Sequence, residues 1–194
     1  MNMRWAHTGA AAHAEVSFRC CCVRGTRLAK RRCVRYSLAT GKTAVLTHFQ
    51  PRNPDFRAFV ERYVGAQGFL RLIGVALSRI DPGEAVFRVD YRPDVGQQDS
   101  VFHGGVIGSV AEAVMGAAAA TLAPVDTNVV GAEYKVNLLA PAAGVTLLAH
   151  GYVMKPGRRL IVCRADISSR DAEGQETLCA IAQGAMAVVP ASSA

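Results

Sequence analysis

Acidic residues are almost missing from the first quarter of this 194-residue chain. Residues 1–54 hold ten Lys and Arg against the single acid Glu15, a net charge of +9, whereas residues 55–194 hold twelve against fourteen, a net charge of −2. The overall formal charge of +7 therefore resides in the first quarter. Because the rest of the chain is close to neutral, it lacks the basic surface that binds a phosphate backbone, and we expect no nucleic-acid partner.

The same first quarter has no sustained hydrophobic period. Three interpretations of residues 1–52 stay open: a disordered basic tail, sequence translated from a start codon assigned too early, and an Arg-rich targeting peptide. We expect one folded domain over residues 53–190 and a short tail over 191–194. The expected localisation is cytoplasmic, with organelle import as the alternative if the tail is a targeting peptide.

The six cysteines lack the spacing of a disulfide framework or of a structural zinc site. Three of them stand in a row at Cys20–Cys22, and Cys33 follows eleven residues later. Cys163 and Cys179 fall in apolar strand patterns, so we expect both in the hydrophobic core. The sequence therefore predicts no metal site and a reducing compartment.

One long apolar segment stands in the middle of the chain, and there is no second one of its kind. From Val106 to Ala120 it is interrupted only by Ser109 and Glu112, and Gly104 and Gly105 precede it. The composition predicts a helix that begins at the two glycines. A membrane span is not expected, because a carboxylate lies near the centre of the segment.

The start of this helix has the features of an anion site. The first N–H groups of a helix lack partners, the helix dipole attracts negative charge there, and glycine lets another molecule approach the backbone. Glu112 follows about two turns later. A buried carboxylate is costly unless it is paired, so Glu112 is either a functional acid or a paired residue of a core helix.

Segments with strand character surround the long helix. A short helix is predicted from Phe56, and strands are predicted over 69–80, 85–92, 127–139, 145–154, 158–168 and 177–189. In 127–139 the alternation places Val130 and Tyr134 on one face and Glu133 on the other. One long helix with antiparallel hairpins predicts an α+β domain in which the sheet wraps around that helix. Strands that are apolar on both faces indicate a covering subunit.

These features resemble a hotdog-fold acyl-CoA thioesterase, of the branch typified by the phenylacetate-pathway thioesterase within the 4-hydroxybenzoyl-CoA thioesterase superfamily. The resemblance covers about residues 55–190 and rests first on His103-Gly104-Gly105, with Glu112 nine positions after the histidine and Gln97 six positions before it. Two further segments resemble family turns, the strand end 136–141 and the turn 157–159.

The resemblance implies a catalytic role for each residue of the motif. Glu112 would act as general base or as nucleophile, and the backbone N–H groups of Gly104 and Gly105 would form the oxyanion hole. Gln97 would orient the water or the thioester carbonyl. His103 would either take part or only hold the loop by a hydrogen bond. Some relatives carry a polar residue four positions after the acid, where this chain has Gly116.

The resemblance also implies how the substrate is held. Arg158 and Arg159 would bind the phosphates of coenzyme A, and Asn137, with Lys135 beside it, would lie near the site. Phe69, Leu70, Leu72 and Met115 would line the acyl pocket, whose apolar character leaves both an aryl and an aliphatic acyl group open. Coenzyme A would be part of the substrate, no separate cofactor is expected, and the assembly would be a homodimer or a tetramer of dimers.

Two other functions remain open. An acyl-CoA hydratase or dehydratase of this fold usually pairs an Asp with a His on the long helix, and this helix has no His after His103. A non-catalytic acyl-CoA-binding module would be expected to lack the acid that Glu112 supplies. Both alternatives fit the sequence less well than a thioesterase.

Overall fold

The structure, a computed structural model, describes residues 36–37, 44–45 and 49–191. The chain divides into two compact units, Met1–His48 and Phe49–Ala194. In the first, β1 (Tyr36–Ser37) pairs antiparallel with β2 (Ala44–Val45). Most of the expected basic tail, including Cys20–Cys22 and Cys33, lies outside the described residues, so its nature stays a prediction.

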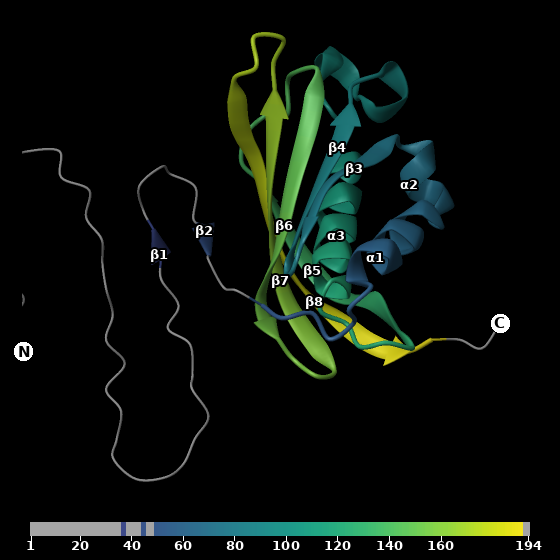
Figure 1. Ribbon diagram of the computed structural model, residues 1–194. Coiled ribbons are helices and arrows are strands. Elements are labelled where there is room, and N and C mark those ends of the chain that lie inside the picture. Colours follow the sequence, from purple (N-terminus) through teal and green to yellow (C-terminus); the bar gives the residue numbers. More distant parts are fainter. Residues whose placement is uncertain (1–35, 38–43, 46–48, 192–194) are drawn as a thin grey trace, which may run out of the picture. The chain divides into compact units, whose positions relative to one another are not determined.

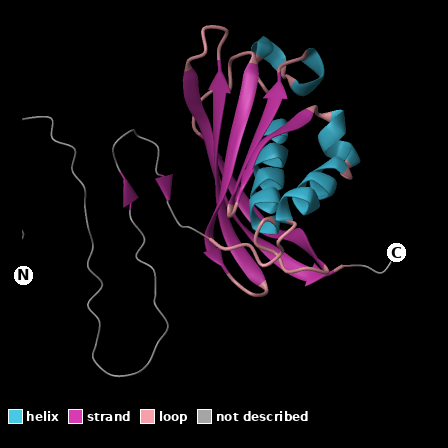
Figure 2. Cartoon of the chain, viewed as in Figure 1, coloured by secondary structure: helices cyan, strands magenta, loops and turns pink. Residues whose placement is uncertain are grey.

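The second unit has one long helix and one six-stranded sheet (Figures 1 and 2). Its elements are α1 (Phe56–Gly65), α2 (Gly68–Leu72), β3 (Val75–Asp81), β4 (Glu84–Asp90), α3 (Gly104–Ala120), β5 (Thr127–Leu138), β6 (Thr146–Pro156), β7 (Leu160–Arg170) and β8 (Glu176–Pro190). All pairs are antiparallel, in the order β3-β4-β6-β7-β8-β5. The predicted α+β arrangement of an antiparallel sheet around one long helix is confirmed.

The long helix α3 lies against the sheet because its residues are small. From Ala113 to Ala120 every residue is buried. A Cβ at Gly151 of β6 would come within 2.5 Å of the Val114 carbonyl oxygen, so only glycine allows the strand this close to the helix. Cys163 and Cys179 are fully buried, which confirms their predicted place in the core. Within the described part, no helix combines the length and apolar character that crossing a bilayer needs.

The predicted strand over 69–80 is wrong in its first half. Gly68–Leu72 forms the short helix α2, and the strand begins only at Val75, after a turn in which Gly74 has φ +77°. In α2, Leu70 is 3% exposed while Leu72 is 70% exposed, so only one face of this helix packs on the core. An apolar run of this length does not distinguish a short helix from a strand.

Strand β5 also differs from the prediction, because a β-bulge interrupts its alternation. The pairing with β8 shifts between Gly131 and Glu133, which leaves Ala132 as the extra residue. Val129 is therefore buried, whereas Val130 is 47% exposed, against the prediction that Val130 shares a face with Tyr134. β5 is an edge strand of the sheet.

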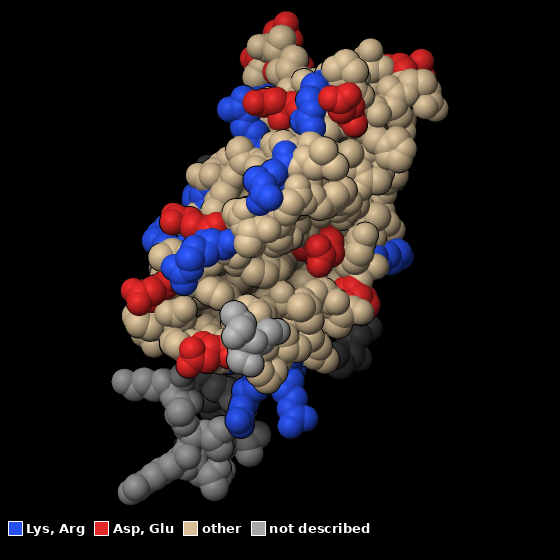
Figure 3. All heavy atoms as spheres, turned by 90° about the vertical axis from the view of Figure 1, so that its right-hand side faces the viewer, with Lys and Arg blue, Asp and Glu red and all other residues tan. Residues whose placement is uncertain are grey.

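The sheet face away from α3 carries polar side chains that bond to one another. His150 Nε2 lies 3.2 Å from Glu84 Oε2, and the Tyr152 hydroxyl donates to Asp166 at 3.0 Å. Arg164 also binds Asp166, at 2.9 Å. The molecular face on the α1 and α2 side is different: Figure 3 shows mostly uncharged atoms there, with single basic and acidic groups dispersed among them.

Candidate active site

The start of α3 is capped by a histidine ring. His103 is the N-cap residue, and its Nδ1 accepts a hydrogen bond from the Gly105 N–H at 2.9 Å. The His103 carbonyl accepts from Val106 and Ile107. The Gly104 N–H has no acceptor among the described residues, so of the two predicted oxyanion donors one is open and the other is bound to the ring. A neutral His103 ring carries its proton on Nε2 in this arrangement.

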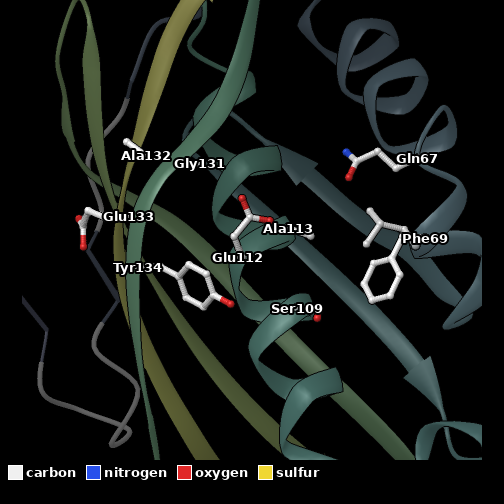
Figure 4. Close-up of a pocket in the computed structure, with 10 residues that line it drawn as sticks. Gln67, Phe69, Ser109, Glu112, Ala113, Gly131, Ala132, Glu133 and Tyr134 are labelled. Atoms are coloured by element: carbon white, nitrogen blue, oxygen red, sulfur yellow. The ribbon is translucent and has the colours of Figure 1, made fainter.

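Glu112 stands in a pocket of about 560 Å³ between α3, the bulged part of β5 and the start of α2 (Figure 4). Its carboxylate Oε1 lies so close to the Gly131 backbone that any side chain at position 131 would overlap with it. Among residues 49–191, none donates a hydrogen bond to Glu112 or forms an ion pair with it. Burial raises the pKa of the Glu112 carboxyl above its ordinary value. The acid is therefore half-buried and unpaired, unlike an acid that only stabilises a core helix.

Three chain segments line this pocket, and only some of their residues were expected from the sequence. The lining comprises Gln67, Phe69, Leu70, Ser109, Glu112, Ala113, Gly131, Ala132, Glu133 and Tyr134. Of the predicted pocket residues, the structure brings Phe69 and Leu70 to Glu112. The Ser109 hydroxyl donates to the Gly105 carbonyl at 2.7 Å, which links the pocket wall to the start of the helix. Figure 4 shows Glu133 pointing away from Glu112 across β5.

The sequence did not predict that Gln67 and Ser109 line the pocket, nor that the bulged part of β5 does. Ser109 could have been found by helical spacing, because it lies three residues before Glu112 and four before Ala113, and residues three or four apart are neighbours on a helix surface. Gln67 and the segment 131–134 carry no comparable local signal, since their place depends on how α2 and β5 pack.

The structure does not bring Met115 to the pocket. Met115 is fully buried and its methyl group lies against Gly184 of β8. Three positions after Glu112 it is rotated by about 60° around the helix axis, toward the sheet. Leu72 is also outside the lining and largely exposed.

Four other predicted residues lie outside the pocket of this chain. Gln97 is exposed in the loop before α3, where its N–H donates to the Val101 carbonyl at 2.9 Å. Asn137 is exposed on β5 beyond the bulge, as is its neighbour Lys135. Arg158 and Arg159 form the exposed turn between β6 and β7. No group of three His, Cys, Asp or Glu in the described part is placed to hold a metal ion.

Comparison with known proteins agrees with this geometry. Residues 99–174, which run from the loop before α3 to the end of β7 and the turn after it, match the family model described as the thioesterase superfamily. The described domain has the hotdog fold, and its middle part is similar to the thioesterase superfamily. The matched segment contains Glu112 and the capped start of α3.

Several relatives of this hotdog domain have known structures or names. A crystal structure of a thioesterase family protein from Silicibacter pomeroyi superposes with a TM-score of 0.68 at 26% identity, covering 70% of this chain and 98% of that one. The PaaI protein of the E. coli phenylacetic acid degradation operon shares the fold, with a TM-score of 0.61 at 17% identity over 71% and 95% of the two chains. A Saccharolobus solfataricus protein named as a candidate esterase is 28% identical over 61% of this chain and 83% of its own.

Proposed function

We propose that this hotdog domain hydrolyses acyl-CoA thioesters to coenzyme A and a carboxylic acid, as a member of the phenylacetate-pathway thioesterase branch. The observation that carries the proposal is the unpaired Glu112 carboxylate in a pocket about two turns from the open Gly104 N–H. The carboxylate takes a proton from an attacking water, or attacks the carbonyl carbon itself. Eight residues of helix place the Gly104 N–H about 12 Å from Glu112, too far for both to act on one carbonyl within a single chain. The N–H at the start of the helix of a second copy would therefore stabilise the oxyanion, together with the dipole of that helix.

The chemistry of the leaving group indicates whether the site suits a thioester or an oxygen ester. Among the pocket residues, Glu112 is the only carboxylate that points inward, so no second acid stands ready to protonate a leaving alkoxide. A thiol with a pKa of about 8.5 leaves as the thiolate and needs no acid to protonate it. A site with one acid therefore suits thioesters better than oxygen esters.

The comparison of a thioester with its oxygen-ester analogue tests this proposal. Acyl-CoA and the ester of the same acid with a simple alcohol would be offered to the full chain, with binding followed by calorimetry. We expect turnover of the thioester and little or none of the ester. Tight binding of acyl-CoA without turnover of either compound would instead favour the non-catalytic binding module.

The pH dependence of turnover is expected to follow Glu112. Because burial raises the pKa of this carboxyl, the ionised form needed for catalysis is lost at a higher pH than for an exposed glutamate. We expect kcat/KM to fall on the acid side with a midpoint above the ordinary glutamate value. A stopped assay from pH 4 to 8 measures this, and a midpoint at or below the ordinary value would contradict the assignment.

Arg158 and Arg159 are proposed to bind the phosphates of coenzyme A, since guanidinium groups suit phosphate geometry. The double change to Ala is expected to raise KM for an acyl-CoA several-fold, because ion pairs at exposed side chains are worth about 0.2–1 kcal/mol each. The control is the same acyl group on pantetheine, which has no nucleotide and should keep its KM. An equal rise in KM for both substrates would show that the arginines do not bind the nucleotide phosphates.

A second copy of the chain is proposed to pair along β5. This strand lies at the sheet edge, and Tyr134 and Leu138 on it are exposed, as is Leu139 just after its end. An unpaired edge with exposed apolar side chains favours association. A homodimer, or a tetramer of dimers, would bury this edge and narrow the mouth of the pocket. Arg158, Arg159 or Asn137 could then contact a substrate bound by the partner.

A further inference from the structure

Tyr63 of α1 reaches both elements that flank Glu112, namely α3 and β5. Its hydroxyl donates to the carbonyl of Val129, two residues before Gly131 on β5, at 3.1 Å. The same oxygen would lie 3.1 Å from a Cβ at Gly116, which is four residues after Glu112 on α3. One phenol group thus contacts both α3 and β5.

The contacts of the phenol group lie beside the pocket, one step further along α3 and β5 than Glu112 and Gly131. Glu112 and Gly131 line the pocket, whereas Tyr63, Gly116 and Val129 do not. α1 holds the ring in place, since its neighbour Val60 is fully buried and Phe59 packs on the Tyr63 ring with centroids 6.3 Å apart. The space between α3 and β5 beside the acid is therefore filled by one side chain from α1.

The phenol of Tyr63 keeps its proton at neutral pH. Burial and the negative charge of Glu112 raise the pKa of Tyr63 to about 12. The hydrogen bond to the Val129 carbonyl therefore persists over the whole range in which the acid could work. It ties β5 to the helices next to the bulge at Ala132, where the ladder with β8 is interrupted.

We propose that Tyr63 is a positioning residue for Glu112: it ties β5 to α1 beside the carboxylate, holds the Gly131 backbone against Oε1, and closes this side of the pocket to water. The role rests on the proposed function, because it serves the reaction of the acid. Tyr63 does not line the pocket, so its loss should act on the chemical step and not on substrate binding.

Two variants and their combination test this role. Tyr63→Phe keeps the ring and removes the bond to Val129, and we expect kcat to fall by about tenfold with KM nearly unchanged, as for a misplaced catalytic group. Gly116→Ala places a methyl group 3.1 Å from the phenol oxygen and should displace it, with a similar loss. In the Tyr63→Phe background the nearest ring atom is Cζ at 4.0 Å, so the added methyl fits and should cost nothing further.

The control is Gly108→Ala on the same helix, where the added methyl group meets only Tyr134 Oη at an ordinary 3.8 Å. This variant should keep wild-type kcat. The acid limb of the pH profile gives a second readout that a purely structural residue would not move. Water reaching Glu112 from this side in Tyr63→Phe should lower its pKa toward the ordinary value, so the limb should move to lower pH.

The outcomes separate this role from the proposed function. Non-additive losses of kcat and a shifted acid limb, in variants whose urea unfolding midpoints show them folded, support the role. An active wild type with unchanged kcat and pH profile in Tyr63→Phe overturns the positioning role alone, as do equal effects of Gly116→Ala in both backgrounds. A wild type without turnover of any thioester overturns the proposed function and this role with it.

Discussion

Glu112→Gln is expected to lower thioester turnover by at least about a hundredfold, which is the usual contribution of a general base. The amide is nearly isosteric with the acid, so it leaves the pocket shape intact while removing the group that takes the proton. Free-thiol release from an acyl-CoA measures the effect. Glu133→Gln is the matched control, because Glu133 is the neighbouring carboxylate but points away across β5 and should be dispensable (Figure 4).

The same substitution is expected to stabilise the fold at neutral pH. Burial raises the folded-state pKa of Glu112 above its unfolded value, so the native state binds this proton more tightly than the unfolded chain does. Glu112 therefore contributes stability at a pH below its pKa in the unfolded chain, and this contribution is lost as the pH rises through its pKa in the folded protein. At pH 7 the unpaired acid therefore costs stability that the amide does not.

Urea unfolding of wild type and Glu112→Gln at pH 7 and pH 4 would measure this difference. The variant should be more stable at pH 7, and the two should converge at pH 4, where the acid is protonated. A variant that is less stable at pH 7 would mean that a donor compensates the carboxylate, contrary to its unpaired state.

Gly131→Ala is expected to reduce kcat by about a hundredfold, because a displacement near 1 Å of a catalytic group can have this effect. The new methyl group would overlap with Glu112 Oε1, and the carboxylate is the more movable of the two. Steady-state kinetics would measure the loss. In the Glu112→Gln background, where the acid is already absent, the added methyl should cost little more.

The control for this change is Gly65→Ala, since a Cβ at Gly65 meets nothing within 4 Å. It should leave kcat and the unfolding midpoint close to those of wild type. If Gly131→Ala kept wild-type kcat while remaining folded, the carboxylate would not depend on its place against β5, and the geometry of the site would need revision.

The elements that could be predicted from the sequence are those set by local spacing. The glycines before an apolar run located the start of α3, and nine residues of spacing put Glu112 on the same helix as the capped end. Period-two alternation found the strands, and the hairpin order indicated an antiparallel sheet around the helix. These signals need no knowledge of distant contacts.

The parts that could not be predicted depend on packing between distant segments. The bulge at Ala132 appears only when β5 is paired with β8, and it changes which residues of β5 face the core. The segment that forms α2 was predicted to be a strand because a short apolar run shows neither helical nor strand periodicity. Tyr63 lies far from Glu112 in sequence, and only the packing of α1 against α3 brings them together.

Thiol release by the full chain across phenylacetyl, benzoyl, short-chain and long-chain CoA esters tests the central claim most directly. The account predicts turnover of at least one of these thioesters, with rates that fall as pH drops below the raised pKa of Glu112. Absence of turnover with every ester, while calorimetry shows that the CoA esters bind, would contradict it and identify a binding module in place of an enzyme.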